Sequence, residues 1–402
     1  MLAIALVDRV GSGLWASVSV LYFTYVSGLS LAEVGTLAAA SGAIGIVGAP
    51  LAGRIADRLP LTRVLIALQL LRALASFALL TTDDYALLLA VSALGALGDR
   101  AANVLTKLYA TRIAGPDRVR YQALNRTVAN AGWALGGLAA AAALALDSTA
   151  AYRWLLAGDA LSFVAAALLT LRCGEPPSPT RVVAGSESTP RTARRANPWR
   201  DRDYLAYVAT DTVLFLDDAV FKVGLPLWIA HSDQVPHGLA PLLLVLNNVM
   251  VVALQVPLAR LGTSSEAARR LLVPLSAAFA LGGITMSLSA TGGTLTAILL
   301  LTAAAAAFTA AEMLHATISW ELSVALAPDT ALGAYLGVHG LAQSAQRSIG
   351  PLAVTAAIAT GPLGWTAFGA AIALTCGMQH RLVRGRLPQP PLSVAPITVS
   401  EH

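Results

Sequence analysis

The sequence predicts an all-α polytopic membrane protein of twelve transmembrane helices, and its composition, apolar blocks and arginine distribution support that prediction. Of the 402 residues, 56% are hydrophobic and only 12% are charged, which is about half the charged share of a typical soluble protein. The apolar residues form blocks of about 20, the length that crosses a bilayer core of ~30 Å. Because strand-like alternation does not recur, a transmembrane β-barrel is disfavoured.

The apolar blocks, taken in order, define the twelve expected helices. The first begins at Leu2 and is too long for the core of a signal peptide. Short turns rich in Gly, Pro and Asp, such as Asp83-Asp84 and Gly361-Pro362, separate the blocks. We expect helices at residues 2–26, 31–52, 62–81, 85–110, 122–146, 152–171, 204–230, 238–261, 271–290, 293–322, 333–359 and 362–380.

One long polar stretch, residues 172–203, divides this series into six helices plus six. It is rich in Pro, Ser, Thr and Arg, a composition that cannot bury an apolar core. We therefore expect a first helical bundle at 1–171, a cytoplasmic linker at 172–203, a second bundle at 204–380 and a cytoplasmic tail at 381–402.

Weak internal repeats relate the two predicted bundles. Asp8 aligns with Asp211, and Pro50-Leu51-Ala52 aligns with Pro257-Leu258-Ala259, at an offset that drifts slowly along the chain. Parallel repeats of this kind predict two pseudo-symmetric six-helix bundles with a binding site between them, near the middle of the membrane.

The distribution of arginines orients the chain, because short cytoplasmic loops carry an excess of Lys and Arg. With the N-terminus inside, the predicted outer loops hold only Arg153. We therefore expect both termini to be cytoplasmic, and the arginine-rich and alanine-rich composition indicates a bacterial protein of the cytoplasmic membrane. The predicted inner loops and tail contain Arg54, Arg58, Arg63, Arg112, Arg118, Arg120, seven arginines from Arg172 to Arg202, Arg260, Arg269, Arg270, Arg381, Arg384 and Arg386.

Several classes of function lack a matching motif. The net charge of +5 is explained by the loop arginines, so it does not indicate a nucleic-acid partner. No Walker loop, zinc motif or nucleophile elbow occurs, and Cys173 and Cys376 alone form neither a disulfide framework nor a metal site. We therefore expect no metal and no cofactor, and an ion or substrate gradient as the source of energy.

Ionisable side chains inside the predicted helices are costly to bury, so each marks a candidate functional position. Asp217 and Asp218 lie near the middle of the seventh helix, and Glu312 and His315 share one face of the tenth. We expect proton-coupling groups among these four, with Asp217 or Asp218 loading and releasing a proton. The alternative is permanent structural pairing, for example of Asp218 with Lys222.

Other polar residues of the helices are candidates for a substrate cavity, because charged and amide groups face lipid poorly. For Asp99, Arg100 and Arg126 we favour mutual pairing or gating over contact with a substrate. The full set of cavity candidates is Asp99, Arg100, Arg126, Lys222, Asn247, Asn248, Gln343, Gln346 and Arg347.

The loop expected between the second and third helices, residues 53–63, carries the most specific motif, GRIADRLPLTR. It resembles the signature loop of the major facilitator superfamily, in which Gly is followed after three residues by Asp-Arg and then by a further basic residue. The resemblance implies that fold, a monomer, and a latch that holds the two bundles in the outward-open state. Asp57 would pair with a nearby arginine or face the N-terminal end of the eleventh helix. The gating residues so implied are Gly53, Asp57, Arg58, Arg63 and Arg112.

The fifth expected helix is similar to the corresponding helix of many bacterial efflux members of that family. The similarity rests on Arg126, Asn130, Gly132 and Gly136, whereas the Gly-Pro pair of drug antiporters is replaced by Gly-Gly at residues 136–137. We therefore expect proton-coupled export, by alternating access, of a small amphipathic molecule.

Two alternatives to export stay open. Uptake of a small metabolite or organic anion, proton-coupled or facilitated, is favoured by the intramembrane arginines, among them Arg100, Arg126 and Arg347. A membrane-embedded enzyme or a receptor is disfavoured, because the six histidines are scattered and no large extramembrane domain is predicted. The expected partners are a small-molecule substrate, protons and the lipid bilayer.

Overall fold

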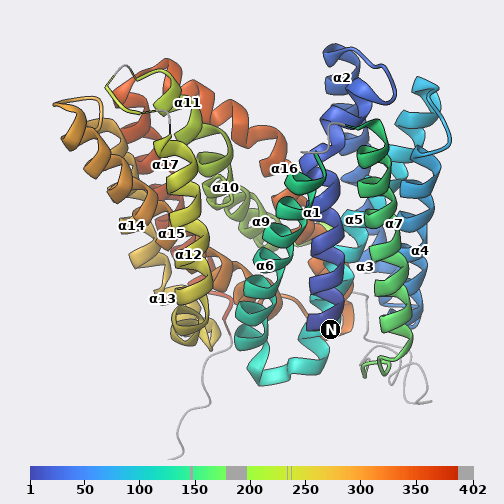
Figure 1. Cartoon of the computed structure of the whole chain (residues 1–402). Helices are drawn as coiled ribbons and strands as arrows, with labels where there is room; N and C mark the ends of the chain where they lie inside the picture. Colours follow the sequence, from blue (N-terminus) through green and yellow to red (C-terminus); the bar gives the residue numbers. More distant parts are fainter. Residues whose placement is uncertain (145–147, 178–196, 233, 237, 388–402) are drawn as a thin grey trace, which may run out of the picture.

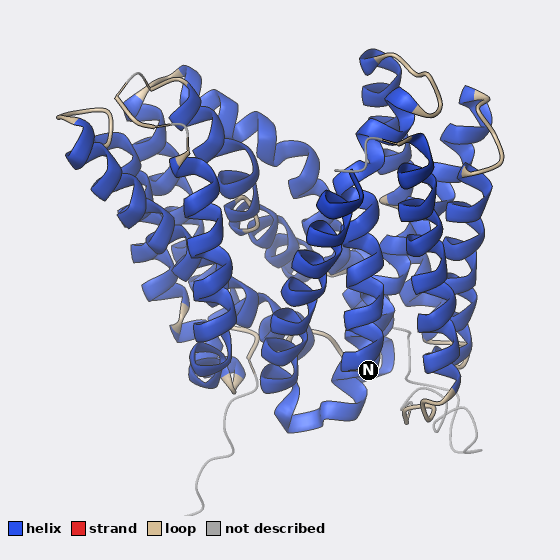
Figure 2. Cartoon of the chain, viewed as in Figure 1, coloured by secondary structure: helices blue, strands red, loops and turns tan. Residues whose placement is uncertain are grey.

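The computed structural model describes residues 1–144, 148–177, 197–232, 234–236 and 238–387. Within these ranges the chain is helical and contains no strand (Figure 2). The central part of the predicted linker, residues 178–196, and most of the predicted tail, residues 388–402, lie outside the described residues.

Helices occupy all twelve expected segments. Those of the first half are α1 (Leu2–Tyr25), α2 (Leu31–Gly45), α3 (Gly48–Ala56), α4 (Leu61–Leu79), α5 (Tyr85–Ala114), α6 (Arg118–Leu144) and α7 (Thr149–Leu171). Those of the second half are α9 (Arg202–Leu214), α10 (Asp217–Ala219), α11 (Leu225–Ala230), α12 (Leu239–Ala259), α13 (Ser265–Arg270), α14 (Leu272–Leu288), α15 (Thr294–Ala325), α16 (Leu332–Ala359) and α17 (Pro362–Arg384).

Two of the expected helices are interrupted. The second is broken between Gly45 and Gly48 into α2 and α3. The seventh consists of α9, α10, a π-helical turn at Val220–Gly224 and α11. Pro226 follows that turn and has no N–H with which to continue the regular hydrogen-bond ladder. Such π turns are rare and often occur at functional sites.

Length and composition mark most of these helices as membrane-spanning. Large apolar side chains remain exposed along them, for example Leu74 (67%), Trp154 (76%) and Leu363 (79%), as expected where the surrounding solvent is lipid. Among the described residues, eight stretches are long and apolar enough to cross a membrane: Leu2–Tyr25, Ala32–Ala56, Leu61–Leu79, Tyr85–Ala114, Thr149–Leu171, Leu239–Gly262, Ser265–Leu288 and Thr294–Ala325.

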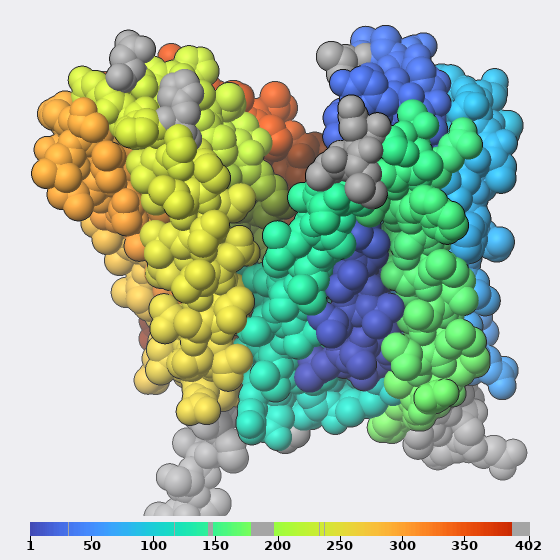
Figure 3. Space-filling view, in the orientation of Figure 1, coloured from blue at the N-terminus to red at the C-terminus, as the bar shows by residue number. Residues whose placement is uncertain are grey.

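The helices form two groups that correspond to the two halves of the sequence. In the first half α1 packs on α6 and α7, and α4 packs on α5 and α7. In the second half α14 packs on α15 and α17, and α12 packs on α15. The two groups meet at the end of the molecule that holds the N-terminus and separate at the opposite end (Figure 1). The space-filling view is hollowed between them at that open end (Figure 3).

The contact between the halves depends on small residues. α3 and α5 of the first half touch α16 of the second, and α6 touches α12 and α15. A Cβ added to Gly53 would lie only 2.1 Å from the carbonyl oxygen of Gly333. The backbones of α3 and α16 approach so closely at this point that nothing larger than glycine fits.

Candidate functional site

A buried carboxylate in the second half lies at the centre of a polar cluster. Asp211, on α9, is fully buried. Its Oδ2 lies 2.8 Å from Nε2 of His339, on α16, and accepts a hydrogen bond of 2.8 Å from the Ser319 hydroxyl. Its Oδ1 lies 3.2 Å from Nε2 of His315, on α15, and accepts from the Gln379 amide at 3.3 Å. We call these five residues and Asp217 the Asp211 cluster.

Asp217 adds a second carboxylate to the cluster. Its Oδ2 lies 3.6 Å from Nδ1 of His315, so that imidazole has an aspartate at each ring nitrogen. Aromatic rings enclose the two histidines: Phe215 meets His315 edge-on at 4.5 Å, and Tyr207 stacks on His339 at 5.8 Å. The arrangement can hold one or two protons between imidazole and carboxylate while excluding water.

The first half contains a cluster of different chemistry. Arg72, on α4, is buried and donates from Nη1 to Asp8 at 2.6 Å and to Gln69 at 3.2 Å. Its Nη2 donates to Asp99 at 3.3 Å, and its guanidinium lies 3.9 Å from the centre of the Phe163 ring. We call Asp8, Gln69, Arg72 and Asp99 the Arg72 cluster. Its cation is permanently charged, so it is unsuited to proton exchange.

The four predicted proton-coupling residues are distributed over three sets of contacts. Asp217 and His315 meet in the Asp211 cluster. Asp218 forms an ion pair of 2.8 Å with Lys222, the structural alternative considered from the sequence, and the Gln346 amide donates to the same carboxylate oxygen at 3.5 Å. Glu312 does not contact His315 although the two share a face of α15.

Glu312 instead joins the two halves. It forms an ion pair with Arg126, on α6, and accepts a hydrogen bond of 2.7 Å from Asn247, on α12. Asn247 also donates to Thr309 at 3.1 Å. Arg126 is therefore engaged by a carboxylate of the opposite half, whereas the sequence suggested Asp99 of its own half.

The remaining cavity candidates either form other contacts than expected or form few contacts. Asp99 pairs with Arg72, which corrects the expectation that it pairs with Arg100 or Arg126. Asn248 is exposed and donates to the Leu244 carbonyl of its own helix, so its amide needs no cavity. Gln343 and Arg347 are exposed on α16, and Arg100 is partly buried on α5.

The predicted gating loop lies where the two halves meet. The two carboxylate oxygens of Asp57 accept hydrogen bonds of 3.0 Å from the backbone nitrogens of Gly333 and Ala334, in the first turn of α16. The positive end of a helix dipole favours an anion at that position. Arg112 lies 3.8 Å from Asp57, whereas Arg58 and Arg63 are exposed.

Sequence reasoning missed several contacts of the closed end. Arg118, expected in a loop, is the first residue of α6 and donates to both oxygens of the buried Glu321 at 2.7 and 2.5 Å. Lys107 donates to Ser323 at 2.7 Å and lies 4.9 Å from the Trp320 ring. For Lys107 and Glu321 the sequence signal was a charge inside a predicted helix, and Arg118 carried no such signal.

The centre of the Asp211 cluster was also missed. Neither Asp211 nor His339 is among the site residues that the sequence predicts. The alignment of Asp211 with Asp8 in the internal repeat was the signal that would have identified it.

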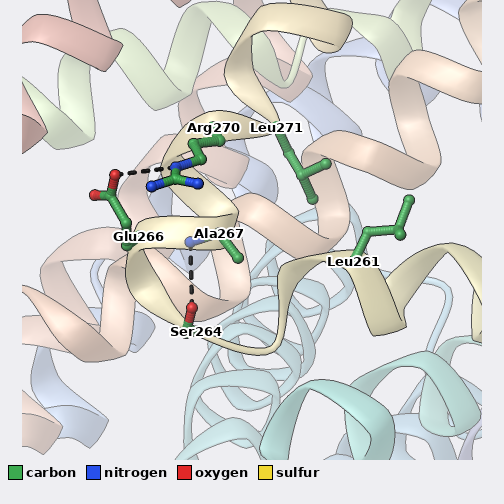
Figure 4. A pocket seen from close by; sticks show the side chains of 6 residues that line it. All are labelled: Leu261, Ser264, Glu266, Ala267, Arg270 and Leu271. Carbon is green, nitrogen blue, oxygen red and sulfur yellow. Dashed lines mark hydrogen bonds and ion pairs between the residues drawn. The ribbon is translucent and has the colours of Figure 1, made fainter.

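A hollow of about 540 Å³ also lies on the surface near α13. Its six lining residues include Glu266 and Arg270, which pair with each other at 3.2 Å (Figure 4). Neither cluster of buried charges contributes a residue to it. It is therefore separate from the candidate site.

Comparisons with known proteins agree with this architecture. A bacterial homologue of the iron transporter ferroportin, in an outward-facing state, matches with a TM-score of 0.69 at 14% identity, over 96% of this chain and 97% of that chain. The fucose:proton symporter of E. coli matches with a TM-score of 0.67 at 17% identity, over 96% and 98%. The proton:xylose symporter XylE matches with a TM-score of 0.65 at 14% identity, over 96% and 95%.

Such low identities establish the fold, and sequence comparison establishes the family. No curated protein matches the chain. The sequence model of the Major Facilitator Superfamily matches residues 1–378, and the matched structures are transporters. The chain is a multi-pass membrane transporter, not an enzyme, and it belongs to the major facilitator superfamily.

Proposed function

We propose that this transporter couples substrate movement to protons by alternating access, and that the Asp211 cluster is its proton site. The observation that carries the proposal is the buried Asp211 carboxylate held between two imidazoles, 3.2 and 2.8 Å away. Imidazole titrates near neutral pH. A cluster of this kind can therefore change its charge within the range of a cellular proton gradient.

The placement of the imidazoles links their charge to the contact between the halves. His315 and His339 lie on α15 and α16, the helices that touch the first half. On α15, Glu321 follows His315 by six residues and holds Arg118 of α6. A proton that alters the packing of α15 or α16 would change the relative free energies of the open and closed contacts, as coupling requires.

Export of a small amphipathic molecule is the direction we propose. It is supported by the similarity of the fifth helix to efflux members, carried by Arg126, Asn130 and Gly132. With both termini in the cytoplasm of a bacterial cell, the open end faces outward, where an exporter releases substrate and takes up protons. Only one arginine, Arg153, lies in the predicted outer loops, and this distribution supports that orientation. We further propose that the protein acts as a monomer.

The test is the lumenal pH of proteoliposomes that contain the purified protein and a trapped pH indicator. Lipophilic cations, neutral drugs and organic anions are added in turn under an imposed proton gradient. Substrate-dependent proton movement is expected for the wild type and for Asp83→Asn, an exposed control. The same movement is expected to be lost in Asp211→Asn and Asp217→Asn, while labelled substrate still exchanges. Full proton-driven transport in both cluster variants would overturn the proposal.

Import is the second candidate function. It is favoured by Arg100 and Arg347, two arginines of the membrane helices that form no ion pair with any described carboxylate. In the same vesicles, protons that move against the substrate indicate export by antiport, and protons that move with it indicate import by symport.

A further inference from the structure

Two arginines from opposite halves lie on helices that touch each other, and within the described part of the chain neither has an acceptor. Arg100 lies on α5 and Arg347 on α16. Among the described residues, neither forms an ion pair or a side-chain hydrogen bond, and Nη1 of Arg100 is buried without a partner. A buried N–H group without an acceptor is costly. An acceptor supplied by a ligand would remove that cost.

Helix geometry places both side chains just beyond the point where α5 and α16 touch. A Cβ on Gly340 would lie 3.0 Å from Cγ2 of Val104, so these residues mark the contacting faces. Arg100 precedes Val104 by four residues and Arg347 follows Gly340 by seven, which keeps each on its contacting face. Both displacements run toward the end where the halves separate (Figure 1). The two arginines therefore lie at the floor of the hollow between the two halves.

The charges around this floor favour an anion. Arg347 is close enough to Arg100 to repel it and close enough to Asp99 to attract it. However, the Asp99 carboxylate is already engaged by Arg72 and by Asn103, each at 3.3 Å. A negative group between the arginines would offset their repulsion.

A neighbouring amide completes the set of donors. Gln343 precedes Arg347 by one turn of α16, is exposed and forms no hydrogen bond with a described side chain or backbone group. Its amide nitrogen can donate to the same ligand as the Arg347 fork. Arginine forks match the planar geometry of a carboxylate and also suit sulfonate and phosphate oxygens.

We infer that Arg100 and Arg347 bind the anionic group of the substrate, a carboxylate, sulfonate or phosphate ester on a small amphipathic molecule. The inference rests on the proposed transport function and narrows its substrate class. Since one arginine comes from each half, such a ligand bridges the halves at the floor of the hollow.

The test measures binding in detergent without any proton gradient. The probes are 1-naphthoate, 1-naphthalenesulfonate and 1-naphthyl phosphate, with 1-naphthamide and 1-naphthylmethylamine as neutral and cationic counterparts. Saturable stabilisation against heat is expected with at least one anion and not with its counterparts. Arg100→Gln and Arg347→Gln should each weaken that binding about tenfold or more, the usual effect of losing charge-assisted hydrogen bonds. Arg153→Gln, at an exposed position, is the matched control.

Three results would overturn the inference: stabilisation by no anion, equal stabilisation by the amide or amine, or unchanged binding in both arginine variants. Unliganded Arg347→Gln should unfold at or above the wild-type temperature, because the substitution relieves repulsion, so a folding defect does not confuse the result. The test is independent of coupling. Anion binding without proton movement would refute the proton site and retain the anion site. Proton movement driven only by neutral compounds would refute the anion site and retain the proton site.

Discussion

The Arg72 cluster and the Asp211 cluster lie at related positions of the two halves but differ in their cations. Each is built on an aspartate that the internal repeat aligns, Asp8 in α1 and Asp211 in α9. Asp8 is paired with a guanidinium at 2.6 Å, whereas Asp211 lies between two imidazoles at 2.8 and 3.2 Å. One half therefore holds a fixed charge pair, and the other holds groups that exchange protons near neutral pH.

The difference indicates a division of labour between pseudo-symmetric halves. A permanently charged, buried pair stabilises one arrangement of helices at every physiological pH. Imidazoles respond to protons, and here they lie on α15 and α16, which contact the other half. We expect the first half to act as a rigid body and the second to contain the responsive element, and the following variants test that comparison.

The largest effect is expected from Arg72→Gln, because it leaves the buried Asp8 carboxylate with only the more distant Arg9, at 3.7 Å. Breaking a buried ion pair costs about 3–5 kcal/mol of unfolding free energy. The loss should be equal at pH 6 and pH 8, as measured by thermal unfolding in detergent. Arg120→Gln, at an exposed position, serves as the control. A loss that changes with pH would contradict the fixed-charge interpretation.

A smaller effect is expected from Arg118→Gln, which breaks the contact between α6 and Glu321. Loss of a hydrogen bond to a charged group costs about 1.5–3 kcal/mol. This cost destabilises only the state in which the two halves are closed at the end that holds the N-terminus. Spin labels at Arg63→Cys and Arg270→Cys, with both native cysteines replaced, should therefore report longer distances. Arg120→Gln should leave the distances unchanged. Unaltered distances in Arg118→Gln would show that this ion pair does not hold the end closed.

His315→Gln should cost only about 1 kcal/mol in stability, because the glutamine amide can still donate a hydrogen bond to Asp211. Its effect on function should be larger. The rate of substrate-driven proton movement should lose its dependence on pH, because the titrating imidazole has been removed. His231→Gln, at an exposed position, should retain the dependence. A retained profile in His315→Gln would remove this histidine from the proton site.

The smallest effect is expected outside the membrane, at the ion pair of Asp201 with Arg386, with oxygen–nitrogen distances of 2.7 Å. Hydrogen bonds from Arg386 hold the pKa of Asp201 below its usual range. The pair therefore contributes stability above the unfolded-state pKa of an aspartate, and this is lost as the pH falls through the lower folded value. Surface pairs contribute about 0.2–1 kcal/mol.

Unfolding of Asp201→Asn compared with wild type over pH 2–6 measures that contribution. Asp203→Asn, on the exposed side of the same turn, is the control. A difference from wild type that persists unchanged below the folded pKa would show that the ion pair is not its source. Because this window lies well below that of imidazole, the variant also checks that pH effects near neutrality come from the histidines.

Much of the fold was predictable because hydropathy is a local property. Each run of apolar residues determines a membrane helix by itself, so the expected segments differ from the observed helices by only a few residues at most ends. The exceptions have local causes that are visible only in the structure. The π turn at Val220–Gly224 and the extension of α6 back to Arg118 both bring charged residues into contacts that hydropathy does not encode.

The candidate site was predictable only as a set of residue types. The cost of burying charge identified Asp217, His315 and Glu312 as notable, but it did not indicate their partners. His315 and Glu312 are three residues apart, yet one contacts Asp211 and the other contacts Arg126 of the opposite half. Small differences in direction around a helix decide which neighbour each side chain meets.

By itself, the sequence determined that the chain is helical, embedded in a membrane and a member of its superfamily, because these properties depend on composition, short periodicities and local motifs. The tertiary structure alone decided that Asp211 meets His339, 128 residues away in sequence, and that Arg118 binds Glu321 of the opposite half. Such pairs depend on how each helix is rotated and tilted against its neighbours. That choice is made by packing summed over whole helix faces, which no single stretch of sequence specifies.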